Sequence, residues 1–232
     1  MKNYERKIPV IYGIDYLTHD IPTYRLVPSE NYQACLMFFK SLRLLNYPLK
    51  ALVCDDNSNI YTACLEVYPK AIVQICQNHF KENIRRFLAV RTTQTYKPFM
   101  AEIYQLFKRK LSYGVFVDQA KLIYAKYKAD PKCKTVMLDM RDKLPLLLSH
   151  LQTKHIPRTT NLIECFNSHL QGRLKTIKGF KSFKHADLWF NAYFIRRRFK
   201  KFKDCKGQFK CLNGKRSVDV VAKRGIKMPK IF

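Results

Sequence analysis

The sequence is short of acidic side chains. It has 17 Asp and Glu against 44 Lys and Arg in 232 residues, which gives a formal net charge of +27 at pH 7. A field of that sign attracts polyanions whatever their sequence, so nucleic acid is the expected partner. Basic RNA-associated proteins have similar surfaces, and charge alone therefore does not separate an enzyme from a binding protein.

Paired cysteines and long apolar runs are also missing. The eight cysteines show no paired spacing and most lie in apolar segments, which argues against a disulfide scaffold and fits a reducing compartment. No apolar run approaches the ~20 residues that span a membrane. The start of the chain is too interrupted for a signal peptide. We therefore expect a cytoplasmic, nucleoid-associated protein with no membrane partner.

The first part of the chain predicts alternating strands and helices around a substantial core. Strands are expected at residues 10–16, 23–27, 51–54 and 71–75, and helices at about 30–45 and 59–68. A right-handed strand–helix–strand crossover pairs its strands in parallel, so the ends of 51–54 and 71–75 should meet at one sheet edge. Ligand and metal sites favour that edge.

The second part predicts helices. They are expected near residues 78–91, 97–112, 115–128 and 133–151, as a block of their own. After Pro157, the residues Thr159, Thr160 and Asn161 offer capping side chains for a further helix. Glu164 lies in the first turn of that helix, off its apolar stripe.

Most of the excess charge lies near the C-terminus. Residues 173–232 hold 19 Lys or Arg and three Asp. From Arg196 to Lys203 basic residues alternate with aromatic ones. Beyond about Cys205 the polar sequence has no period and predicts a flexible basic tail.

Two carboxylates, Asp55 and Asp56, follow the apolar strand at 51–54. The strand would hold them rigidly, and the Asn-Ser-Asn turn that follows would leave them open to solvent. Hard divalent cations take oxygen ligands, and two-metal phosphoryl chemistry uses carboxylates from separate elements. Glu164 is the natural second acid, although an acid in the first turn of a helix commonly interacts only with the helix dipole.

Three segments, in this order, resemble the signatures of one family. Residues 52–57 (LVCDDN) resemble the strand that carries the second catalytic Asp in DDE transposases of the mutator type. Residues 68–79 (YPKAIVQICQNH) resemble the P-x-A-x-x-Q-x-C-x-x-H signature of that family, and residues 159–167 (TTNLIECFN) resemble its T-T-N-x-x-E-x-x-N helix. The similarity covers residues 8–203, and the combination is more specific than any one motif.

The resemblance implies an α/β fold with an RNase H-like mixed-sheet core, an all-helical insertion and a basic C-terminal helix plus tail. The implied divisions are residues 1–87 for the first part of the core, 88–157 for the insertion, 158–203 for the helices that complete the core and carry Glu164, and 204–232 for the basic flexible tail.

The implied function is DNA transposition. Such an enzyme cleaves DNA at the element ends with Mg²⁺, or with Mn²⁺ in its place, and transfers the freed 3′-hydroxyl strand to target DNA. Asp55 and Glu164 are then metal ligands, and Asp56 stands where the family commonly has Gly. Transposases of this kind generally act as homo-oligomers.

This sequence can be aligned in two ways with the part of the family that contains the first catalytic Asp. The family places it on a first strand that two more strands follow before the helix, whereas this sequence predicts only two strands before residue 30. The favoured alignment makes 10–16 the second strand and the chain an N-terminally truncated, inactive remnant. The other alignment makes Asp15 the third catalytic residue.

Cys76 and His79 form a Cys-x-x-His pair, but no second pair of matching spacing follows. We therefore expect structural roles, with Cys76 packed at the strand end and His79 ordering the helix start. The candidate DNA contacts, which would position DNA without reading its sequence, are Arg158, Asn161, Arg173, Lys175, Lys178, Arg196, Arg197 and Arg198. Two other functions stay open: a non-catalytic basic nucleic-acid-binding protein, and a stand-alone RNase H-like nuclease that cuts without joining strands.

Overall fold

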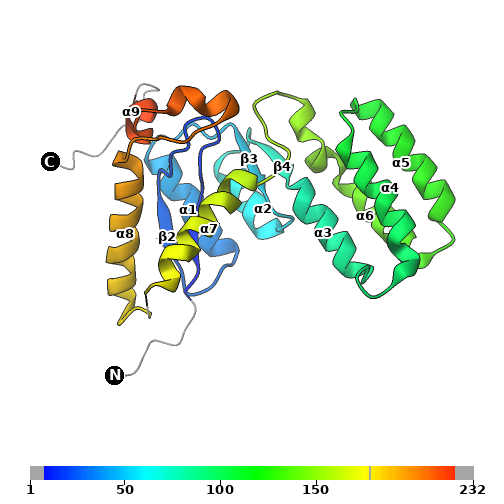
Figure 1. The fold of residues 1–232 in the computed structure, drawn as a ribbon, viewed down its shortest axis with the longest axis horizontal. Coiled ribbons are helices and arrows are strands. Elements are labelled where there is room, and N and C mark those ends of the chain that lie inside the picture. Colours follow the sequence, from blue (N-terminus) through cyan, green and yellow to red (C-terminus); the bar gives the residue numbers. More distant parts are fainter. Residues whose placement is uncertain (1–7, 178, 223–232) are drawn as a thin grey trace. The chain divides into compact units, whose positions relative to one another are not determined.

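The computed structural model describes residues 8–177 and 179–222. They form a mixed α/β structure, rich in helices, that divides into two compact units (Figure 1). Unit 1 takes its residues from the ranges 1–49, 59–70 and 161–232, and unit 2 from 50–58 and 71–160. None of the described helices combines the length and the apolar character needed to cross a membrane.

The four predicted strands are present, and the described residues arrange them as two separate two-stranded sheets. The strands are β1 (Val10–Tyr12), β2 (Tyr24–Leu26), β3 (Ala51–Cys54) and β4 (Ile72–Ile75). In unit 1, β1 and β2 pair antiparallel, and in unit 2, β3 and β4 pair in parallel as predicted. The first strand is shorter than the predicted 10–16 because the chain turns at Asp15.

Unit 1 is built on aromatic packing. Its helices are α1 (Tyr32–Leu44), α2 (Ser58–Val67), α7 (Asn161–Lys175), α8 (Phe183–Phe199), the 3-10 helix η3 (Gly207–Leu212) and α9 (Ser217–Ala222). Ile21, Phe166, Leu170, Phe190 and Phe194 form a buried cluster, against which the apolar side chains of β1 and β2 pack. This burial of large rings explains why α7 and α8 cover the β1–β2 hairpin.

Unit 2 joins the β3–β4 pair to a helical block. Its helices are α3 (Gln77–Phe87), η1 (Gln94–Tyr96), α4 (Lys97–Lys108), α5 (Tyr113–Tyr127), α6 (Pro131–Leu147) and η2 (Ser149–Leu151). One core cluster runs from Ile75 and Phe80 through Phe99 and Met140 to Leu148. The Asp130 side chain accepts a hydrogen bond from Cys133 N (2.9 Å) and caps α6 at its start.

The end of α6 and η2 attach to β4 by hydrogen bonds. Ser149 Oγ donates to Val73 O (2.6 Å), and the buried Gln74 side chain donates to Leu147 O (2.8 Å) and accepts from His150 N (2.7 Å). Gln74 is fully buried, and these bonds satisfy its amide. The C-terminal end of the helical block is therefore fixed to β4.

The prediction of a flexible tail after Cys205 is corrected for the described residues up to 222, because they contain ordered helices. This segment forms η3 and α9, and Leu212, Val218 and Val221 are buried. Phe209 packs against His19 in the β1–β2 loop, with ring centroids 4.5 Å apart. Residues 223–232 of the predicted tail lie outside the described residues.

A buried ion pair holds this C-terminal segment to the β1–β2 loop. Arg198 donates from Nε and a terminal nitrogen to the two carboxylate oxygens of Asp20, each at 2.9 Å. Ser217 Oγ donates to the same carboxylate at 2.8 Å. The Asp20 side chain is 0% exposed and that of Arg198 14% exposed. Local periodicity could not reveal this contact, because its partners are far apart in the sequence.

We predict that Asp20→Ala lowers the free energy of unfolding by about 3–5 kcal/mol, because it leaves the Arg198 guanidinium buried without a counter-charge. Urea unfolding followed by circular dichroism measures the change. The control is Asp219→Asn, which removes the exposed pair with Arg216 (2.7 Å) and should change stability by less than about 1 kcal/mol. Equal effects of the two substitutions would contradict the assignment.

Candidate active site

The parallel pairing of β3 with β4 places the first residues of the candidate site, Asp55 and Cys76, at one edge of the sheet. Cys54 lies opposite Ile75, and Cys76 N donates to Cys54 O at 2.8 Å. Asp55 and Cys76 therefore follow their strands at the same sheet edge, as the sequence predicts. Helix α3 begins directly after Cys76, which puts His79 in its first turn.

His79 contacts Asp55. Its Nδ1 lies 2.7 Å from Asp55 Oδ1, and the side chains are 37% and 52% exposed. Because a carboxylate only accepts hydrogen bonds, this contact assigns the proton to His79 Nδ1. The histidine thus orients the Asp55 carboxylate while solvent still reaches it.

Thr160 completes the group. Its backbone N–H and its hydroxyl both donate to the buried Cys76 Sγ, at 3.4 and 3.2 Å. Its Oγ1 also lies 3.3 Å from His79 Nδ1. Gln77 N donates to Arg158 O at 3.0 Å. The residues just before α7 are therefore attached to the junction of β4 and α3.

The ligand atoms of Asp55, Cys76 and His79 lie within 4.8 Å of one another. The Cys76 thiol is fully buried and already accepts two hydrogen bonds, which suits a structural role better than a zinc ligand. The half-exposed Asp55 carboxylate is the donor of this group that fits a hydrated Mg²⁺, which takes one or two carboxylates and keeps several waters.

The neighbouring Asp56 has a different partner. Lys143 of α6 contacts it at 2.6 Å and also contacts Asp139 at 2.8 Å. The Asp56 side chain is only 14% exposed. Asp55 therefore faces solvent, whereas the adjacent Asp56 forms an ion pair with the helical block.

Glu164 lies in unit 1, in the first turn of α7, and is partly buried. Packing on β1 fixes this helix: the Tyr12 and Phe166 rings meet edge to face at 5.6 Å, and Tyr12 Oη donates to Asn167 Oδ1. Glu164 thus occupies a helix that its neighbours hold firmly.

Asp15 closes a turn. Its Oδ1 accepts from the backbone N–H groups of Leu17 (2.9 Å) and Thr18 (2.7 Å), and Tyr47 Oη donates to its Oδ2 at 2.5 Å. Both carboxylate oxygens are therefore occupied by protein donors. This arrangement accounts for the acid without a catalytic role.

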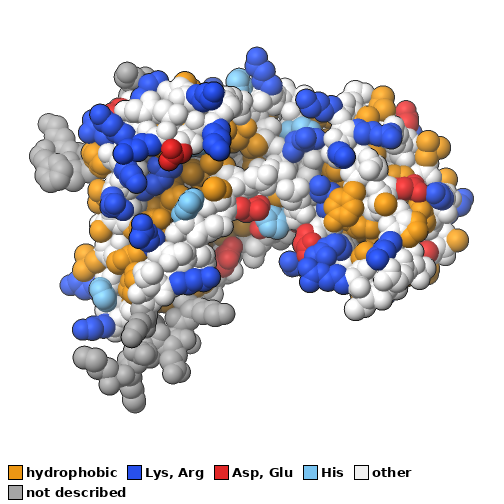
Figure 2. Space-filling view, in the orientation of Figure 1, with side chains coloured by type: hydrophobic (Ala, Val, Ile, Leu, Met, Phe, Trp, Pro, Cys, Tyr) orange, Lys and Arg blue, Asp and Glu red, His pale blue; other side chains and the backbone are white. Residues whose placement is uncertain are grey.

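The predicted DNA contacts fall into different environments. Asn161, Arg173, Lys175 and Arg196 are exposed in unit 1, and Figure 2 shows Lys and Arg side chains widely spread over the face drawn. Arg158 is half-buried in unit 2, and Lys178 lies outside the described residues.

Two of the predicted contacts have structural partners. Arg197 stacks over Phe202, with its guanidinium carbon 4.7 Å from the ring centroid, and burial lowers its pKa. Arg198 corrects the prediction, because its ion pair with Asp20 buries it away from solvent.

Sequence reasoning missed the contacts of Thr160 and Lys143. Thr160 belongs to the T-T-N motif, but its motif position predicts a helix cap and not a bond to a thiol. Lys143 carries no local signal, because its partner Asp56 is 87 residues away in the chain.

Comparison with known families supplies the deciding observation: the sequence profile of the Mutator family of transposases matches residues 7–186. The chain belongs to this family. Comparison with curated proteins gives no match. The family match covers β1 through the start of α8, so both units of this transposase-family chain contribute to it. It supports a role in transposition with DNA as the partner, and transposases generally use divalent metal ions.

We predict that Thr160→Val costs about 1 kcal/mol of unfolding free energy, because valine keeps the bulk of the side chain and removes the hydrogen bond to Cys76 Sγ. Thr160→Ser should retain most of the stability. The adjacent Thr159→Val is the matched control and should change stability by less than about 0.5 kcal/mol. Urea unfolding of the three variants tests this, and an equal loss at both threonines would contradict it.

Proposed function

We propose that the chain cleaves DNA phosphodiester bonds and joins the freed strand to target DNA, with Asp55 and Glu164 as its metal-binding acids. The observation that carries the proposal is the Asp55 carboxylate at the end of β3, oriented by His79 and open to solvent. Membership of the Mutator family supports DNA as the substrate.

Chain connectivity supports Glu164 as the second acid. Thr160 is bonded to Cys76 beside Asp55, and α7 begins at the next residue. Glu164 follows Thr160 by four residues in the chain and lies in the first turn of α7.

Both acids supply the oxygen ligands that Mg²⁺ and Mn²⁺ prefer. Asp55 and Glu164 would hold a divalent ion, which would supply activation of the attacking oxygen and stabilisation of the leaving oxygen in phosphoryl transfer. His79 holds Asp55 in one orientation, and Lys143 keeps Asp56 turned toward α6. In the alternative alignment Asp15 would be the family's first catalytic Asp, with its carboxylate held by the bonds of its turn.

The proposed architecture is an RNase H-like core with a helical insertion. The element order β1-β2-α1-β3-α2-β4-α3 supports it, and α7 would complete the core. The proposed division keeps residues 1–87 and 158–203 as core and 88–157 as insertion. The active complex would be a homo-oligomer on DNA.

Nicking of supercoiled plasmid in Mn²⁺ or Mg²⁺ tests the catalytic proposal without knowledge of the element ends. We expect Asp55→Asn and Glu164→Gln each to abolish nicking, because each removes a charged ligand. Asp56→Asn is the matched control and should retain activity.

If the unmodified chain binds DNA but nicks none, and the three variants bind equally, the non-catalytic binder is the correct function. Nicking without transfer of a labelled 3′ end would instead favour a stand-alone nuclease. If Asp56→Asn lost nicking activity as fully as Asp55→Asn does, the separate roles proposed for Asp55 and Asp56 would be contradicted.

We also predict that His79→Gln raises the metal concentration needed for half-maximal nicking by about 10- to 100-fold, because outer residues that orient ligands affect metal affinity by that much. Excess Mn²⁺ should restore most of the rate. A fall in rate that metal does not restore would show that His79 does more than orient Asp55.

A further inference from the structure

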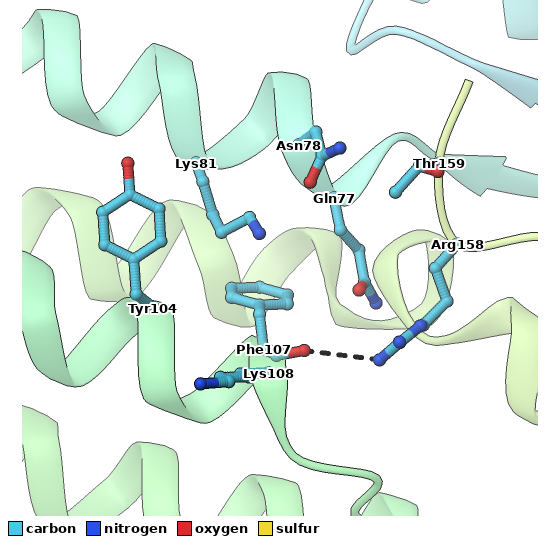
Figure 3. Close-up of a pocket in the computed structure, with 8 residues that line it drawn as sticks. All are labelled: Gln77, Asn78, Lys81, Tyr104, Phe107, Lys108, Arg158 and Thr159. Carbon is cyan, nitrogen blue, oxygen red and sulfur yellow. Dashed lines mark hydrogen bonds between the residues drawn. The ribbon is translucent and has the colours of Figure 1, made fainter. Parts of the chain in front are cut away.

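Unit 2 contains a cavity of about 300 Å³ beside the candidate site. It lies between α3, α4 and the segment before α7 (Figure 3). Its lining consists of Gln77, Asn78, Lys81, Tyr104, Phe107, Lys108, Arg158 and Thr159. Ligand pockets commonly measure about 300–1,000 Å³, so this volume suits a small ligand.

The lining is cationic. Lys81, Lys108 and Arg158 contribute three positive charges and no carboxylate lines the cavity. In the part of the chain that the structure describes, none of the three forms an ion pair. Burial, and then repulsion from Arg158, lower the pKa of Lys81. Like charges gathered without a counter-charge are unfavourable, and an anion bound between them would relieve that cost.

The contacts that these cations make now are weak. Lys81 Nζ lies over the Tyr104 ring, 5.6 Å from its centroid. The Arg158 guanidinium donates to Phe107 O at 3.4 Å, as the dashed line in Figure 3 shows. A charge-assisted hydrogen bond to a phosphate is considerably stronger than either contact.

The cavity also has aromatic walls. Phe107 is buried, and Tyr104, which also lines the cavity, is 42% exposed. Movement of Lys81 from the Tyr104 ring to a phosphate would uncover the ring face for stacking. Stacking on aromatic rings is how proteins hold unpaired bases without reading sequence. Free phosphate would use the cations alone and leave this wall without a partner.

We propose that this cavity binds one nucleotide unit of unpaired DNA, with its phosphate between Lys81, Lys108 and Arg158 and its base against Tyr104. Two of its lining residues, Gln77 and Asn78, stand between Cys76 and His79 in the chain. This cavity proposal rests on the proposed function, because it takes DNA as the ligand. The DNA strand bound in the cavity would be one that has separated from its complementary strand near the site of cleavage.

The test is fluorescence anisotropy with a labelled short oligodeoxythymidylate and the full chain carrying Asp55→Asn, without divalent metal. These conditions measure binding apart from catalysis, so failure of one proposal leaves the other testable. Lys81→Gln with Lys108→Gln should lower the slope of log affinity against log salt by about 1.4, because each contact to a single-stranded phosphate contributes about 0.7. The matched control is Lys128→Gln with Lys134→Gln, two exposed lysines outside the cavity.

Tyr104→Ala should weaken binding by about 5- to 100-fold, and Tyr104→Phe should retain it, since the ring stacks and the hydroxyl does not. Tyr113→Ala removes a similarly exposed ring (50%) on α5 and is the aromatic control. Thermal unfolding confirms that each variant is folded.

Competition experiments distinguish a site for a nucleotide from a site for any small anion. Thymidine monophosphate should displace the oligonucleotide at lower concentration than inorganic phosphate does. Equal displacement by the two, together with no effect of Tyr104→Ala, would show a simple anion site and overturn the proposal. Equal effects of the cavity and control lysine pairs would also overturn it.

Discussion

The candidate site depends on the attachment of Thr160 to the junction of β4 and α3. The buried Cys76 thiol accepts two hydrogen bonds from this residue, and His79 contacts both Thr160 and Asp55. These bonds fix the residue before α7 next to the end of the parallel strand pair. Thr160 lies 84 residues after Cys76 in the chain, so this attachment is a long-range contact within unit 2.

In this cationic chain, several of the described acids form ion pairs with Lys or Arg. Ion pairs join Arg198 to Asp20, Lys143 to Asp56 and Lys126 to Glu102. Asp55 differs, because its partner is the histidine His79 and half of its side chain is exposed. The positive charge of the chain attracts DNA toward this carboxylate. The charged residues that line the unit 2 cavity are all cations, which gathers this positive charge at one place.

Local patterns predicted the strands β3 and β4 and the helices between residues 77 and 147, because apolar periodicity is set by burial within each element. They also predicted that the carboxyl ends of both strands would lie at one sheet edge, because a right-handed crossover pairs the strands in parallel. The prediction of a flexible segment after Cys205 was wrong for residues 207–222, because the Asp20–Arg198 ion pair that orders it is not visible in any local window. The ion pair of Arg198 with Asp20 was not predicted for the same reason.

The most direct test of the shared metal site is Mn²⁺ binding followed by electron paramagnetic resonance in the unmodified chain, Asp55→Asn, Glu164→Gln and the double variant. If both acids hold one ion, each single substitution removes the same tight site, and the double variant binds no more weakly than the weaker single one. Asp56→Asn should leave the site intact. Loss of separate sites in the two single variants, or tight binding that survives both substitutions, would contradict the account.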